Sequence, residues 1–146
     1  MPAEEPKIVI QEDETGCGIA CAAMLAGSTY HAAKKRAKNL GIFPDDENLY
    51  SDIHDLRTLL ESYNIRIGKK APFRNWNTLP STAIVAINYK TDLDSPSWHW
   101  AVFHRGDTGP VVLDPSRRLK RNVRTDLGKV KPAWYVPVGN PAQGKA

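Results

Sequence analysis

The two cysteines of the chain, Cys17 and Cys21, lie one helical turn apart within the stretch QEDETGCGIAC. A structural zinc site needs about four nitrogen or sulfur ligands, usually arranged as closely spaced pairs. The sequence has no second pair of that kind, so zinc would require both cysteines to converge with His99 and His104, which we do not expect. A thioredoxin-like redox site uses the C-x-x-C spacing, whereas three residues separate these cysteines. The pattern therefore predicts neither a metal site nor a cofactor.

A nucleophilic cysteine explains more of this stretch. Cys17 is predicted to begin a helix, where unpaired backbone N–H groups and the positive end of the helix dipole stabilise a thiolate. Gly16 and Gly18 flank it without side chains, which we expect to leave room for a substrate backbone. Cys21, one turn further along among alanines, is predicted to be a small buried residue. Gln11 lies six residues before Cys17, and its amide, together with the Cys17 backbone N–H, can stabilise an oxyanion.

Such a thiol also needs a base and a group that orients the base. The stretch WHWAVFHRGDTGPVVLDPS offers His99 and Asp114, on two predicted strands joined by the turn RGDTGP. The imidazole would take the proton of the thiol, and the carboxylate would fix the orientation of the ring. His104 is the rival base. Strand alternation places it on the same face as Trp100, however, and His99 on the other face, so we favour His99.

These residues together resemble a known family. The pattern Gln-x5-Cys at the start of a helix is similar to that of papain-like cysteine peptidases, and GCGIACAAML resembles the C39 type within that superfamily. Measured from Cys21, Gln11 would be ten residues away, which resembles no papain-like pattern. The resemblance implies a papain-like fold in which Cys17 is the nucleophile, His99 the base, Asp114 its orienting partner and Gln11 part of the oxyanion hole.

The elements that must position these residues are helical in the first half of the chain. Residues 17–26 are rich in Ala, Met and Leu and are followed by Gly27, which can adopt the left-handed conformation of a helix cap. A second helix is predicted over residues 30–40 with Ser28 or Thr29 as its N-cap. A third is predicted over residues 52–64 with Ser51 as its N-cap, because its leucines recur along one stripe.

The second half changes to short β-branched and aromatic segments at residues 81–89, 97–104, 110–114 and 133–138. Helices followed by strands predict an α+β domain, with N-terminal helices packed on a largely antiparallel sheet. A length of 146 residues suits one domain, so we expect a single domain over residues 1–146 with a frayed tail from about residue 139.

The composition of the chain limits where the protein is expected to be found and which partners it is expected to bind. No apolar run approaches the ~20 residues that would span a bilayer, and the acidic start MPAEEPK does not resemble a secretory signal. We therefore expect cytoplasmic synthesis, with delivery to another cell or compartment by a signal-independent route as an alternative. The net charge is +4, with basic residues concentrated over residues 117–131. We interpret this segment as a solvated face, with an acidic partner as the alternative; the motifs of nucleic-acid binders do not accompany it.

Relatives of the C39 type typically cleave leader peptides after a double glycine and are fused to a membrane exporter with an ATPase. This sequence instead predicts a free-standing cysteine protease acting on a peptide or protein substrate, as a bacterial processing enzyme or a delivered effector. One alternative is a glutamine deamidase or acyl transferase that uses the same catalytic triad. Another is a non-catalytic binding domain on a papain-like scaffold, since a fold does not fix a function. The intact set of Cys17, His99, Asp114 and Gln11 argues against this last alternative.

Overall fold

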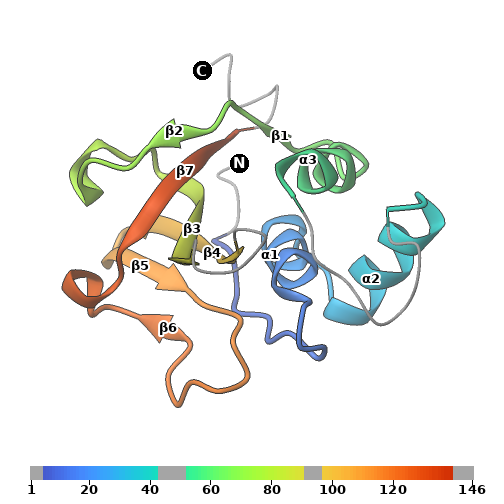
Figure 1. Ribbon diagram of the computed structural model, residues 1–146, viewed down its shortest axis with the longest axis horizontal. Helices are drawn as coiled ribbons and strands as arrows, with labels where there is room; N and C mark the ends of the chain where they lie inside the picture. Colours follow the sequence, from blue (N-terminus) through green and yellow to red (C-terminus); the bar gives the residue numbers. More distant parts are fainter. Residues whose placement is uncertain (1–4, 43–51, 91–96, 140–146) are drawn as a thin grey trace.

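The computed structural model describes residues 5–42, 52–90 and 97–139, and in these residues three α-helices lie beside a seven-stranded sheet (Figure 1). Two short 3-10 helices, Trp76–Thr78 and Leu127–Lys129, lie in the connections. The helices are α1 (Cys17–Ala26), α2 (Tyr30–Asn39) and α3 (Ile53–Glu61). Helix α1 packs against the sheet, while α2 and α3 pack against α1. None of the helices in the described ranges is long and apolar enough to cross a bilayer.

The ends of the helices follow from local capping. Helix α1 ends at Gly27, whose φ of +66° is the left-handed conformation that the sequence predicted. The hydroxyl of Thr29 accepts a hydrogen bond from the backbone N–H of Ala32 and so caps α2, again as predicted. The N-cap of α3 is Asp52, which forms a reciprocal capping box with Asp55. The prediction of Ser51 as this cap was therefore wrong, and Ser51 itself lies outside the described residues.

The sheet is antiparallel at every described pair of strands, which confirms the predicted α+β class. Its order is β1-β7-β3-β4-β5-β6, and β2 pairs with β7 off this path. Four strands correspond to the predicted ones, although with somewhat different ends: β3 (Thr82–Lys90), β4 (Ser97–Gly106), β5 (Gly109–Leu113) and β7 (Pro132–Gly139). Three two-residue strands were not predicted: β1 (Arg66–Ile67), β2 (Ala71–Pro72) and β6 (Val123–Arg124). The predicted tail falls, from residue 140 on, outside the described residues.

Hydrophobic side chains cover both faces of the central strands. Trp100 and Val102 of β4 belong to the cluster that includes the helices. Ala101 and Phe103, which point to the opposite face, are buried in a second cluster under residues 73–79 and 127–130. Alternation along β4 holds as the sequence suggested, but the face that carries residues 99, 101 and 103 is buried along most of its length as well. Residues 100–103 in the middle of β4 are buried, whereas His99 near its start and residues 104–106 at its end are partly exposed.

Candidate active site

Cys17 is the first residue of α1 and lies against the edge of β4. The pairing of β4 with β5 ends at Val102↔Leu113. Two residues before Val102, the backbone N–H of Trp100 donates to Cys17 Sγ at 3.5 Å. The sulfur therefore lies beside a part of β4 that β5 does not cover. The thiol is nearly buried, with 8% of Cys17 exposed, and the first N–H groups of the helix have no partner within it.

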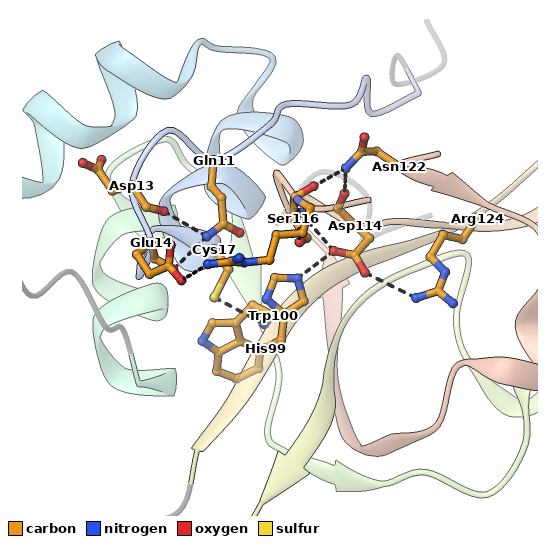
Figure 2. Close-up of polar contacts among 11 residues, drawn as sticks. Gln11, Asp13, Glu14, Cys17, His99, Trp100, Asp114, Ser116, Asn122 and Arg124 are labelled. Atoms are coloured by element: carbon orange, nitrogen blue, oxygen red, sulfur yellow. Dashed lines mark hydrogen bonds and ion pairs between the residues drawn. The ribbon is translucent and has the colours of Figure 1, made fainter. Parts of the chain in front are cut away.

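His99 and Asp114 are in direct contact next to this cysteine (Figure 2). The imidazole Nε2 donates to Asp114 Oδ1 at 2.6 Å. The strand register explains why they meet. Continuing the pairing of Val102 with Leu113 by one residue places Asp114 opposite Ala101, so that it shares a face with His99, two residues away. Because Asp114 occupies Nε2, Nδ1 is the ring nitrogen left for the thiol.

Both ionisable groups of this pair have shifted pKa values. Burial of the ring opposes the charged form of His99, but the hydrogen bonds and charges of Asp114 and Cys17 outweigh this effect and raise the pKa of His99 to about 9. Burial also works against an ionised Asp114. The hydrogen bond and charge of His99, the backbone N–H of Ser116 and the charge of Arg124 nevertheless hold the pKa of Asp114 below its ordinary value. The pair is therefore best described as an imidazolium and a carboxylate near neutral pH.

The backbone around Asp114 is fixed by Asn122. The Asp114 N–H donates to the Asn122 carbonyl at 2.8 Å, and the Asn122 side chain donates back to the carbonyl oxygens of Asp114 and Ser116, both at 2.7 Å. The Ser116 N–H in turn donates to Asp114 Oδ1 at 3.0 Å. These bonds hold the side chain of Asp114, which is 3% exposed, in one orientation.

Gln11 is buried in the loop that precedes α1. Its Nε2 donates to the carbonyl oxygens of Asp13, at 2.9 Å, and Glu14, at 3.0 Å. Its backbone N–H donates to the Pro115 carbonyl at 3.0 Å. The side-chain oxygen of Gln11 is buried without a hydrogen-bond partner among the described residues. Gln11 therefore ties the loop before α1 to the loop after β5.

The expected role of Gly16 needs correction. A Cβ at this position would overlap the hydroxyl of Tyr30, so the missing side chain makes room for Tyr30 of α2 and not for a substrate. That hydroxyl donates to Asp13 Oδ2 at 2.6 Å, and Lys34 forms an ion pair with the same carboxylate at 3.1 Å. Gly16 thus allows α2 to anchor the loop that leads to Cys17.

The other candidate residues lie away from this arrangement. Cys21 is fully buried, and burial raises the pKa of its thiol well above the usual range. His104 Nδ1 is 3.0 Å from the hydroxyl of Thr82 on the neighbouring strand β3. Across the parts of the chain that the structure describes, His, Cys, Asp and Glu do not gather in a group of three or more that could hold a metal ion.

Sequence reasoning assigned no role at the site to Arg124, which the structure places next to Asp114. In the sequence it is one of the basic residues of segment 117–131, and no local feature distinguishes it from the others. Two further arginines of that segment, Arg117 and Arg118, form ion pairs with Glu14 at 2.8 and 2.6 Å. Part of the basic segment is therefore neutralised within the chain.

Comparison with known proteins identifies the fold. No family model matches the sequence, and no curated protein matches it. Among solved structures, the chain is similar to a double glycine motif protease from an AMS/PCAT transporter, crystallised in complex with the leader peptide. The TM-score is 0.62 and the identity 12%, over 92% of this chain and 91% of that one. The chain therefore shares the α+β fold of that protease.

Proposed function

We propose that this protein is a cysteine peptidase that hydrolyses a peptide bond through Cys17, His99 and Asp114. The observation that carries the proposal is the 2.6 Å contact between His99 and Asp114 beside a cysteine at the start of a helix. A raised pKa of about 9 for His99 supports it, because an imidazolium near neutral pH favours a thiolate next to it.

The reaction would proceed in two steps. The Cys17 thiolate attacks the carbonyl carbon, the C–N bond breaks, and the His99 imidazolium gives its proton to the leaving amine. A water molecule then loses a proton to His99 and attacks the thioester, which releases the acid and restores the thiolate. Asp114 remains ionised throughout and keeps Nδ1 of the ring directed at the sulfur.

The developing oxyanion would be stabilised by the Cys17 backbone N–H and by the side-chain amide of Gln11. Gln11 Nε2 carries two protons and contacts the carbonyls of Asp13 and Glu14. For the amide to serve the oxyanion, one of its two N–H groups must turn from a loop carbonyl to the substrate when the substrate binds. The amide would thus shape the loop and assist the reaction.

The likeness in fold supports a proposal for the substrate class. The similar protease was crystallised with a leader peptide, and we infer that this chain likewise binds an extended peptide segment of a peptide or protein. Deamidation and acyl transfer pass through the same thioester, so the products identify the reaction that takes place.

The proposal is tested by the reactivity of Cys17. At about pH 6 an ordinary thiol, with a pKa of ~8.5, is almost entirely protonated. We expect iodoacetamide and an electrophilic peptide probe to label Cys17 in the folded protein far faster than in the urea-unfolded chain, and peptide mapping to show Cys21 unlabelled. The matched variants are Cys17→Ala, which should abolish labelling, and Cys21→Ala, which should keep it.

Turnover is then measured on a library of peptides from a digested proteome, with new termini, deamidated residues and transferred groups detected by mass spectrometry. New termini that depend on Cys17 would support a peptidase. Labelling of native Cys17 no faster than that of the unfolded chain would contradict the proposal.

A further inference from the structure

Arg124 reaches the Asp114 carboxylate from the side opposite His99. Its Nη1 lies 3.5 Å from Asp114 Oδ2, while His99 holds Oδ1 (Figure 2). The register explains the contact. Arg124 of β6 pairs with Val112 of β5. Asp114 comes two residues after Val112 in the chain, so its side chain points to the same face of the sheet as those of Val112 and Arg124.

The guanidinium is held in this position by a second carboxylate. Arg124 Nε and Nη2 donate to the two oxygens of Asp126 at 3.1 and 2.9 Å, which is a bidentate arrangement. The remaining Nη1 is the group directed at Asp114. The Arg124 side chain is only 20% exposed, whereas the Asp126 side chain is 44% exposed. The arginine therefore sits inward of its partner, between solvent and the Asp114 carboxylate.

We propose that Arg124 is a positioning residue of the active site, which keeps Asp114 ionised and directed at His99. This inference rests on the proposed function. A thiolate, an imidazolium and a carboxylate together carry one net negative charge, and burying such a charge is unfavourable. Arg124 brings a positive charge to this buried group, while the charge of its partner Asp126 lies further out, on a side chain that is 44% exposed. Its place in the row of Cys17, His99, Asp114 and Arg124 is visible in Figure 2.

A pH effect follows, and its direction is determined by the charges around the pair. Besides Arg124 and Asp114 themselves, the titratable groups that face this ion pair are His99 of β4, Cys17 and Cys21 of α1, and Asp126 after β6. Without Arg124, the buried Asp114 carboxyl would take up a proton at a higher pH, because only His99 and the Ser116 N–H would remain to support its charge. Once Asp114 is protonated, the imidazolium loses its partner, and the thiolate that depends on it is lost as well. The rate of Cys17 alkylation falls at low pH, and this part of the pH profile is its acid limb. The acid limb should therefore move to higher pH.

The test is the rate of iodoacetamide alkylation of Cys17 as a function of pH. We expect Arg124→Met to move the midpoint of the acid limb up by roughly half to one pH unit, which is a roughly three- to tenfold slower rate on that limb. Arg124→Lys, which keeps the charge, should recover most of the shift. Arg121→Met removes the same charge from an exposed position three residues away and should leave the midpoint unchanged.

The outcomes separate this inference from the proposed function. A wild-type protein whose Cys17 shows no enhanced reactivity would defeat the proposed function itself. A reactive wild type with equal midpoints for Arg124→Met and Arg121→Met would overturn the role of Arg124, since a merely structural arginine would lower the melting temperature without moving the midpoint. Arg124→Gln serves as a second variant if Arg124→Met does not fold, because glutamine keeps a hydrogen-bond donor but carries no charge. It is expected to show the same upward shift of the midpoint. An unshifted midpoint in Arg124→Gln would overturn the inference equally.

Discussion

The interaction between His99 and Asp114 makes a quantitative prediction for the substitution Asp114→Asn. The pKa of His99 is about 9, which is about 2.5 pH units above the ordinary value of 6.5. At about 1.4 kcal/mol per unit, the neighbours of the ring favour its charged form by roughly 3 kcal/mol. Asp114 provides the leading favourable contribution and Cys17 the next. Replacing the carboxylate by an amide of the same shape should therefore lower the pKa of His99 by roughly one to two units.

The same shift has a consequence for stability, and its sign is fixed by the direction of the shift. A pKa that is higher in the folded state than in the unfolded state stabilises the fold fully below about pH 6.5, and this stabilisation is lost as the pH rises through about 9. The free energy of unfolding contributed by His99 in the wild type should thus fall by up to roughly 3 kcal/mol across this range. In Asp114→Asn the fall should be roughly half as large or less.

Two measurements check this prediction. The His99 ring is titrated by proton NMR, and urea unfolding is followed at a series of pH values between about 6 and 10, the range spanned by the two pKa values. Asp107→Asn is the matched control, because it makes the same chemical change at an exposed position in the turn between β4 and β5. A His99 ring that still titrates near 9 in Asp114→Asn would refute the assignment of Asp114 as its main partner.

Two further substitutions test the remaining site residues. His104→Ala should leave rapid alkylation of Cys17 at mildly acidic pH intact, because its ring is held by Thr82 at 3.0 Å, whereas His99→Ala should abolish it; the reverse result would show that the base is misassigned. Gln11→Ala should slow acyl transfer to substrate by roughly 10²–10³-fold, the usual cost of losing one oxyanion donor, with alkylation by a small reagent changed little. Because Gln11 also binds two loop carbonyls, its loss should lower the free energy of unfolding by roughly 1–2 kcal/mol, and unchanged turnover would remove it from the mechanism.

Helices and long strands were predictable from the sequence because their signals are local. Helix α1 has an alanine-rich run and a terminal Gly27, and α2 has Thr29 at its start. The long strands β3, β4 and β7 have β-branched and aromatic runs bounded by turn residues. The strands β1, β2 and β6 each have two residues, and their pairing is decided by the neighbouring strands β7 and β5. A pairing that depends on a distant partner leaves no periodic signal in so short a segment.

The sequence predicted which residues would lie together at the candidate site, but not all of the contacts that they make. Spacing and order led to Cys17, His99 and Asp114, which the structure places beside one another. The role of Gly16 was misjudged because it depends on Tyr30, fourteen residues away on α2, whose hydroxyl occupies the space that the missing side chain leaves. From the neighbouring residues alone, a glycine beside a nucleophile suggests space for a ligand. In the structure, that space is filled by another residue of the same chain.

Arg124 shows the same limit for charge. In the sequence it is one member of a basic segment, and composition assigns such residues to a solvated surface. Its role depends on the pairing of a two-residue strand, β6, which places Arg124 on the same face of the sheet as Asp114. A register one residue different would turn the guanidinium to the opposite face and leave Asp114 without this charge. The electrostatics of the site therefore depend on the pairing of β5 with β6, and a substitution that shifted this short strand would alter the pH dependence of Cys17 without changing any residue that contacts it.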